Sequence, residues 1–376
     1  MGSVRVVANP LRTNTIEDTT PSSVFAFHSG LAGYQATPLL RAPSVARALG
    51  VATALVKDES DRFGMPSFKI LGASWAIYCA LCELLSVSLE PVIPLTQLRQ
   101  LLEGIQPLEL VAATDGNHGR AVARMATLMG LNSHILVPDE MVPARRRAIV
   151  AEGARLTPIQ GTYDDAVRAA AALADNHHLV ISDTSWEGYQ KVPTWVIDGY
   201  STITHELATQ LDALGERAPT VIAVQIGVGA FAAAMVRYAH QKAGTVLVGV
   251  EPADAACMLA SIEAGHLVEV AGPHRSIMAG LNCGNASPVA WPLVSRGLDY
   301  IVAIDDDDAR RAMRLLAQDG IVSGESGAAG LGGLLAGRRQ LKLPPTSTVL
   351  IVSTEGATDP SAYERTVGRL PDVRAR

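Results

Sequence analysis

Lys69 is the first residue whose type and position could support covalent chemistry. It follows Ser67 and Phe68 in PSFKILGASWAI, at the entrance to an expected helix, and it is one of only five lysines in the chain. Apolar neighbours should lower the pKa of its amine, because burial disfavours the charged form. Such an amine can form a Schiff base with an aldehyde cofactor. Taken alone, however, the position favours a lysine that extends along an apolar surface to water.

The turn TDGNHG, residues 114–119, is a second candidate, because it ends an expected strand and opens an expected helix. Its backbone N–H groups and Asn117 would lie at a helix N-terminus, which suits an anion such as a carboxylate. A glycine-rich turn without function is the alternative. His118 could act as a base, but a side chain that packs or holds the loop is favoured.

The stretch QIGVGAFAAAMV, directly after the expected strand VIAV, is the third candidate. Gly227 and Gly229 allow a ligand to approach the backbone, and a helix is expected to begin at Ala230. A strand, a glycine loop and a helix together can hold a phosphate group. Ala232 occupies the last position of G-x-G-x-x-G and no Walker lysine follows, which favours a monophosphate over a nucleotide.

Alternating strands and helices must position these motifs. Between residues 109 and 183, the β-type runs LELVAA, SHILVP, ARLTPI and HLVISD alternate with helical runs, two of which end at Gly130 and Gly153. A second set of β-type runs begins at Val221. This alternation predicts two α/β units with parallel sheets and crossover helices. The segment 86–108 contains three prolines and is expected to be a connection.

Length and composition are typical of a globular protein of two domains. The chain has 376 residues, 48% hydrophobic and 18% charged. The net charge of -6 and the lack of a basic block argue against nucleic acid as a partner. No apolar run reaches the roughly 18 residues of a membrane helix. The N-terminal sequence lacks the apolar segment of a signal peptide, so we expect a cytoplasmic protein.

Two groups of residues could suggest a metal, but both favour a structural role. Cys79 and Cys82 form C-x2-C within an expected helix, without a second pair at zinc-site spacing, and are expected to be core thiols. The acidic run 305–308 is expected to open and cap a helix rather than bind a hard cation. No metal is therefore predicted.

The three motifs, in this order, resemble the fold type II pyridoxal-phosphate (PLP) enzymes, the group of tryptophan synthase β and threonine dehydratase. The set DESDRFGMPSFKILG, TDGNHG, DTSWEGYQKVPTWVIDGYSTI, SIMAGLNCG, VSGESGAAGLGGLL and STEGATDP is similar to the diaminopropionate ammonia-lyases over residues 35–360. The resemblance implies a two-domain α/β fold, each domain a mostly parallel twisted sheet flanked by helices. A large cofactor domain would comprise residues 1–75 and 187–376, and a small domain residues 76–186. It also implies a homodimer.

The same resemblance implies residue roles. Lys69 would hold PLP as a Schiff base, Asn117 would bond its ring hydroxyl, and Thr354 would lie near its pyridine nitrogen. The residues implied around the cofactor are Phe68, Lys69, Asn117, Gly227, Val228, Gly229, Ala230 and Thr354. The residues implied around a small amino-acid substrate are Ser67, Thr114, Asp115, Gly116, His118 and Asp183.

The implied reaction is the elimination of ammonia from 2,3-diaminopropionate, giving pyruvate and ammonia. Lys69 or Asp115 would remove the Cα proton, and Asp183 would be a second base or a clamp for the β-ammonium group. The related dehydratases usually carry a small uncharged residue at position 115, so a carboxylate there would attract a second amine. A turn or N-cap aspartate at position 115 and an Asx turn at Asp183 are the structural alternatives.

Three questions stay open at this point. The chain could be another β-eliminating or β-replacing PLP enzyme, such as a serine or threonine dehydratase or a biosynthetic synthase. It could also be a PLP-binding or small-ligand-binding protein without turnover. Finally, Cys257 and Cys283 could lie within the ~7 Å Cα separation of a disulfide, or be two buried free thiols.

Overall fold

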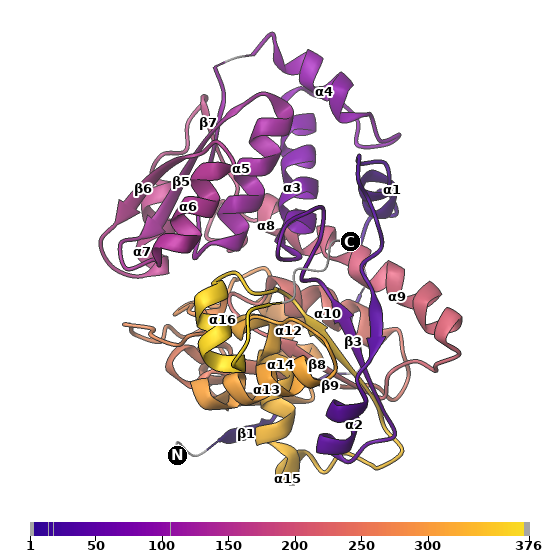
Figure 1. Cartoon of the computed structure of the whole chain (residues 1–376). Helices are drawn as coiled ribbons and strands as arrows, with labels where there is room; N and C mark the ends of the chain where they lie inside the picture. The colour runs from indigo at the N-terminus through magenta and orange to yellow at the C-terminus, as the bar shows by residue number, and fades with distance from the viewer. Residues whose placement is uncertain (1–3, 14, 18, 106, 372–376) are drawn as a thin grey trace.

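Two parallel-type sheets organise the chain, whose computed structural model describes residues 4–13, 15–17, 19–105 and 107–371 (Figure 1). The larger sheet has the strand order β1-β10-β9-β8-β11-β3-β2, and its five inner strands are parallel while β1 and β2 join its edges antiparallel. Its strands are β1 (Arg5–Ala8), β2 (Leu39–Arg41), β3 (Thr53–Asp58), β8 (Val221–Gln225), β9 (Val246–Pro252), β10 (Tyr300–Ile304) and β11 (Thr348–Ser353).

The smaller sheet is parallel throughout, with the order β6-β5-β4-β7, and lies in the upper part of Figure 1. Its strands are β4 (Glu109–Ala113), β5 (Asn132–Pro138), β6 (Arg155–Ile159) and β7 (His178–Val180). Both sheets therefore confirm the mostly parallel α/β architecture that strand and helix alternation predicts.

Helices cover both sheets. They are α1 (Ser23–Ser29), α2 (Pro43–Leu49), α3 (Lys69–Leu84), α4 (Leu95–Leu102), α5 (Asn117–Met129), α6 (Pro143–Ala151), α7 (Tyr163–Ala171), α8 (Lys191–Gly199), α9 (Ser201–Leu214), α10 (Ala230–His240), α11 (Cys257–Ala264), α12 (Trp291–Gly297), α13 (Asp306–Gln318), α14 (Glu325–Ala336), α15 (Arg338–Leu341) and α16 (Pro360–Val367). Short 3-10 turns are η1 (Ala253–Ala255) and η2 (Ala279–Leu281). Among the helices described here, none has the length and low polarity needed to cross a bilayer.

Three local expectations can be compared with these bounds. Asp305 accepts hydrogen bonds from the N–H groups of Asp307 and Asp308 and so caps α13, as the acidic run predicts. Cys79 and Cys82 are both buried on α3. The boundary expected at residue 76 falls inside α3, which packs against both α5 and α8. The division into domains at residues 76 and 186 stays a prediction.

The segment 86–108 is not only a connection, because α4 forms within it. Pro94 precedes the helix in an extended conformation, and Leu98 and Leu102 are fully buried one turn apart. The (i, i+4) spacing puts both leucines on one face of the helix, which packs against α5. The three prolines of this segment lie outside α4, so they do not interrupt its hydrogen bonds.

A buried network of charges fixes the segment that leads to Lys69. Glu206 on α9 accepts hydrogen bonds from Lys57 Nζ at 2.5 Å and from Arg62 Nη1 at 2.6 Å. Arg62 also pairs with Glu59 at 2.7 Å, and Lys57 donates to the Thr37 carbonyl at 2.6 Å. The side chains of Lys57 and Arg62 are 0% and 1% exposed, so neither cation has water to replace a lost anion.

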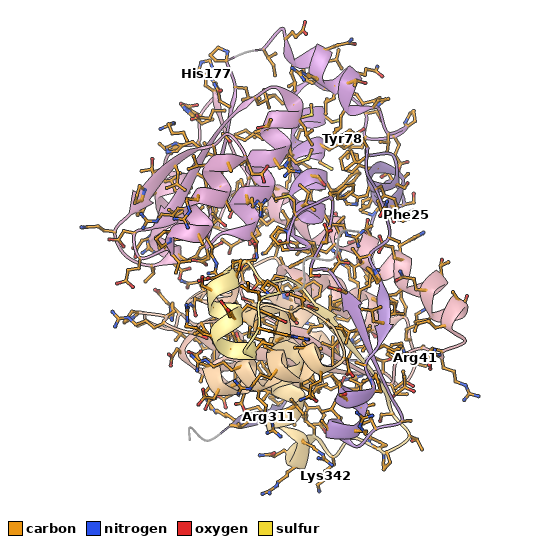
Figure 2. All side chains as sticks on the ribbon, viewed as in Figure 1. Phe25, Arg41, Tyr78, His177, Arg311 and Lys342 are labelled. Atoms are coloured by element: carbon orange, nitrogen blue, oxygen red, sulfur yellow. The ribbon has the colours of Figure 1, made fainter. Side chains whose placement is uncertain are left out.

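We expect Glu206→Gln to destabilise the fold by about 3 kcal/mol, because it leaves two buried cations facing one anion. Urea unfolding followed by circular dichroism measures this loss of unfolding free energy. The dependence of that free energy on urea concentration should not change. The matched control is Glu216→Gln, whose partner Arg41 lies at the edge of the molecule with a side chain 55% exposed (Figure 2). That variant should lose less than about 1 kcal/mol, and equal losses would contradict the prediction.

Candidate active site

A cavity lies where the N-termini of α3, α5 and α10 meet the carboxyl end of β11. It comprises about 800 Å³, including space open to solvent, which is the size of a small-ligand site. The sequence-predicted residues that line it are Phe68, Lys69, Thr114, Asp115, Gly116, Asn117, His118, Asp183, Gly227, Val228, Gly229, Ala230 and Thr354. Segments far apart in the sequence thus meet at the carboxyl ends of parallel strands, where α/β sheets commonly bind ligands.

Ser67 is the one predicted site residue that does not line the cavity. It is buried, pairs with Glu355 through an isolated β-bridge, and its hydroxyl accepts the N–H of Lys69 at 3.4 Å. Ser67 therefore shapes the turn that starts α3.

Lys69, the first residue of α3, forms an ion pair inside the cavity. Its Nζ lies 2.6 Å from Asp183 Oδ2, and Tyr163 donates to Asp183 Oδ1 at 2.9 Å. Burial alone would lower the pKa of Lys69, but the charge of Asp183, its hydrogen bond to Lys69 and the neighbouring Tyr200 and Cys283 together raise the pKa above its ordinary value. The expectation of a lowered lysine pKa is therefore wrong for this arrangement, because Asp183 was not counted among its neighbours. The same pair lowers the pKa of Asp183, although burial opposes this.

The pKa of Asp115 shifts in the opposite direction to that of Asp183. Burial raises its pKa to about 8; the charges of Asp183 and Asp164 add to this, while Arg145 and Lys69 oppose it. Near neutral pH this carboxyl group can thus both take up and release a proton. An aspartate that is always charged, as the sequence interpretation assumed, is not what the structure supports.

His118 and Asn117 hold the loop at the start of α5. His118 is buried, its Nε2 lies 2.9 Å from the carbonyl oxygen of Ile181, and burial lowers its pKa. The neutral ring then donates from Nε2 and keeps Nδ1 as an acceptor. Asn117 donates from Nδ2 to Glu355 Oε2 at 2.5 Å. The favoured sequence interpretation, that His118 packs and holds the loop, agrees with these contacts.

Thr354, directly after β11, is oriented by a residue that the sequence did not single out. Its hydroxyl oxygen accepts a hydrogen bond from Gln225 Nε2 at 2.6 Å, and Gln225 lies at the end of β8. A hydroxyl that already accepts one bond keeps its own hydrogen for another acceptor. Thr354 could therefore donate to the ring nitrogen near which the resemblance places it.

The loop between β8 and α10 fits the phosphate group of PLP. Among the described residues, the backbone N–H groups of Gly227, Val228, Gly229 and Ala230 have no acceptor, and they lie at the N-terminus of α10. Unpaired amides at a helix N-terminus bind anions well. A Cβ on Gly227 would lie 2.9 Å from the carbonyl oxygen of Gly280. The loop therefore has no room for a side chain at Gly227, as expected of a loop whose backbone amides approach a phosphate closely.

We expect Gly229→Ala to weaken PLP binding by about tenfold or more, because Gly229 has φ +101° and a Cβ would lie 3.1 Å from atoms of Ala290 and Met258. The loop must shift to accept the methyl group, and the amides then turn from the phosphate. Titration of the apoenzyme with PLP measures the change. Gly244→Ala is the control, since Gly244 has φ +81° with nothing within 4 Å. An equal loss of affinity in both variants would refute this role.

Several cavity residues were missed by sequence reasoning: Arg145, Tyr163, Gln225, Phe231, Gly280, Leu281, Cys283, Ser326 and Glu355. Gln225 and Glu355 could have been found, because each is a polar residue at the carboxyl end of an apolar strand. Arg145 and Tyr163 come from the helices after β5 and β6, and only the fold brings them to the cavity.

Of the two alternatives for Cys257 and Cys283, the structure has the buried free thiols and not the bridge. Cys257 Sγ instead lies 3.8 Å from Glu251 Oε1, and burial raises the pKa of both thiols well above the ordinary value. Cys283 lines the cavity as a neutral side chain.

Comparisons with known proteins agree with this site. Residues 31–355 match the family model described as pyridoxal-phosphate dependent enzyme. Diaminopropionate ammonia-lyase of Escherichia coli (strain K12) is 37% identical over 91% of this chain and 89% of its own length. The crystal structure of the holo form of diaminopropionate ammonia lyase from Escherichia coli is 34% identical, with TM-score 0.89 over 97% of this chain and 96% of that chain. A complex of the same Escherichia coli enzyme with an aminoacrylate-PLP azomethine reaction intermediate matches over the same shares, at 34% identity with TM-score 0.85. The chain thus belongs to the pyridoxal-phosphate-dependent enzymes of fold type II, and within them to the diaminopropionate ammonia-lyase family.

Proposed function

We propose that this chain converts 2,3-diaminopropionate and water to pyruvate and two molecules of ammonia. The observation that carries the proposal is that Lys69, Asp115 and Asp183 share one cavity with a loop suited to phosphate. The similarity to diaminopropionate ammonia-lyases over nine tenths of the chain supports the same reaction.

Bound PLP supplies an aldehyde that joins reversibly to amines and a conjugated ring that accepts the electrons of the Cα–H bond. Lys69 would hold the aldehyde carbon through Nζ and yield it to the substrate amine. Asn117 and Thr354 would orient the ring from two sides, and the Gly227–Ala230 loop would bind the phosphate. The amides of Asp115 and Asn117 would bind the substrate carboxylate, because the N–H groups of Thr114 and Gly116 already donate to the Leu136 carbonyl and the Thr114 hydroxyl.

The proton at Cα needs a group that can accept it near neutral pH. Lys69 Nζ is held in its charged form by Asp183, whereas the Asp115 pKa of about 8 allows this carboxyl group to exchange a proton. We therefore assign proton transfer in the cavity to Asp115 first. Lys69 could act as a second base, because its displacement from the aldehyde carbon by the substrate amine would release it as a neutral amine.

Asp183 is the candidate clamp for the β-ammonium group of the substrate. Its Oδ2 bonds a cationic amine, Lys69 Nζ, at 2.6 Å, and its Oδ1 is fixed by Tyr163. If Lys69 Nζ leaves Asp183 to hold the aldehyde carbon of PLP, a substrate ammonium could take the same position. The departing β-amine leaves as ammonia, and the enamine that remains hydrolyses to pyruvate and the second ammonia.

A panel of amino acids tests the proposal. The holoenzyme is incubated with 2,3-diaminopropionate of each configuration, serine, threonine and alanine, and pyruvate or other 2-oxoacids are measured. Diaminopropionate should give the highest kcat/KM. Preference for serine or threonine would overturn the substrate assignment and point to a dehydratase, whereas no turnover would leave a binding protein.

We further infer a cytoplasmic homodimer. The similarity to the diaminopropionate ammonia-lyases supports both the compartment and the dimer. Light scattering after size exclusion should give about twice the chain mass of 39.5 kDa. A monomer would overturn this inference without affecting the proposed reaction.

A further inference from the structure

Glu355 lines the cavity directly after Thr354, although nothing in the reaction requires an acid at this position. The residue is 3% exposed. A buried carboxylate is costly unless hydrogen bonds or opposite charges compensate it. Its partners therefore indicate what the carboxylate does.

Both carboxylate oxygens of Glu355 have a defined donor. Oε2 accepts from Asn117 Nδ2 at 2.5 Å, and Oε1 accepts from the backbone N–H of Ser326 at 3.1 Å. Ser326 is the second residue of α14, so the positive end of that helix stabilises the negative charge. Neither partner is a cation, and the bond to Asn117 is therefore charge-assisted from the Glu355 side.

A second buried carboxyl group nearby lacks these contacts. Glu325 begins α14 and is 5% exposed, and its carboxyl group accepts a hydrogen bond from its own backbone N–H. Its pKa is raised to about 7 by burial and by the charge of Glu355, while Arg145 opposes the shift and Asp359 adds to it. The two carboxyl groups are thus neighbours, yet only Glu355 bonds to Asn117.

We propose that Glu355 is a positioning residue that fixes the side-chain amide of Asn117 for the cofactor. A carboxylate only accepts hydrogen bonds, so Asn117 must turn Nδ2, and not Oδ1, toward it. One of the two amide orientations is thereby excluded, and Oδ1 and the second N–H remain for the ring hydroxyl. The proposal rests on the cofactor-binding role of Asn117 given under the proposed function.

The same contact joins two parts of the fold at the cavity. Asn117 begins α5 after β4 of the smaller sheet, and Glu355 follows β11 of the larger sheet. Gly324 also donates its N–H to the backbone oxygen of Glu355 at 2.9 Å. The loops from both sheets are therefore held together beside the expected position of the cofactor ring.

The first test is Glu355→Gln, with the apoenzyme titrated with PLP and the visible band recorded. We expect affinity for PLP to fall by about 5- to 20-fold, because glutamine keeps the shape but loses the charge-assisted bond. The band should also move, since the ring hydroxyl loses a fixed partner. Glu325→Gln is the matched control and should leave affinity and band unchanged. An unchanged band and affinity in Glu355→Gln would overturn the proposal.

A double-mutant cycle separates positioning from a general structural role. In the background of Asn117→Ala, Glu355→Gln should change PLP affinity by less than about twofold, because the residue through which Glu355 acts is gone. Additive losses would show that Glu355 acts elsewhere. If Glu355→Gln does not fold, Asn117→Asp tests the contact from the other side, because it opposes two carboxylates. Asn117→Asp should then lose more affinity than Asn117→Ala, and equal losses would overturn the proposal.

These measurements need no substrate. If diaminopropionate fails in the amino-acid panel but the coupling between Glu355 and Asn117 is found, the substrate assignment is wrong and the positioning role stands. If the panel succeeds without coupling, only the positioning role is wrong.

Discussion

Lys69→Ala is expected to abolish the visible absorbance band of the enzyme and to lower pyruvate release by at least about 10³-fold. The band, at about 410–420 nm for a protonated Schiff base, requires an amine joined to the cofactor. Lys69 is the only one of the five lysines of the chain, all of them described, that lines the cavity. Its loss therefore removes both the attachment point and a proton carrier.

Borohydride reduction identifies the attachment directly. The pyridoxyl group should be found on the peptide that contains Lys69 in the wild type and on no peptide in Lys69→Arg. Arginine keeps the charge that pairs with Asp183 but cannot form the Schiff base, so this variant controls for loss of the ion pair. Labelling of Lys57 or Lys191 instead would refute the assignment. Lys57 is an unfavourable site, because its amine is fully buried against Glu206.

The sequence was most informative where a local turn requires a particular residue type. Gly229 must be glycine for its φ of +101°, and the strand, loop and helix around it can be recognised from sequence. The N-terminus of α5 after β4 could be predicted for the same reason, and so could the cap of α13 by Asp305. Such features depend on neighbours in the chain, which the sequence displays directly.

Charge states could not be predicted in this way. The raised pKa of Lys69 depends on Asp183, which lies 114 residues away, and the raised pKa of Asp115 depends on burial between two sheets. Glu355 and Asn117 are separated by 238 residues. Electrostatic interactions fall off with distance in space, and sequence separation says little about that distance until the fold is known.

The sequence could not decide between a bridge and two free thiols at Cys257 and Cys283 for a related reason. Both cysteines stand in motifs that resemble those of the family, but a matching motif does not fix the direction of a Cβ–S bond. Cys257 faces Glu251, whose carboxylate also accepts the N–H groups of Met258 and Leu259 at 2.8 Å. The start of α11 is thereby anchored without a covalent link.

Asp115→Asn should lower kcat for diaminopropionate by about 10²–10⁴-fold, the range for loss of a general acid or base. The substitution keeps the shape of the side chain and removes its ability to exchange a proton. The visible band should persist, because Asp115 does not hold the cofactor. Any residual turnover of serine should fall by a similar factor, because serine also carries a Cα proton that Asp115 would accept.

The pH profile provides the sharper measurement. With a pKa of about 8, Asp115 in the substrate-free enzyme is mostly protonated at pH 6 and mostly ionised at pH 9. If its carboxylate accepts the proton from Cα, kcat/KM for diaminopropionate should rise about tenfold per pH unit below pH 8 and then level off. Asp115→Asn should lose this limb of the profile. An identical limb in the variant would assign the titration to another group, and an unchanged kcat on both substrates would leave Asp115 with a structural role.

Stability offers a readout of Asp115 that is independent of catalysis. Because burial holds its folded-state pKa above that of the unfolded chain, the folded state binds the extra proton between about pH 4 and pH 8. This contribution to stability is fully present below pH 4 and is lost as pH rises through 8. Asparagine does not titrate, so the stability of Asp115→Asn relative to the wild type should improve across that window in urea unfolding of the substrate-free protein. A constant difference between the two proteins from pH 4 to pH 8 would mean that Asp115 is not held protonated in the fold, and its assignment as the proton carrier would then fall with it.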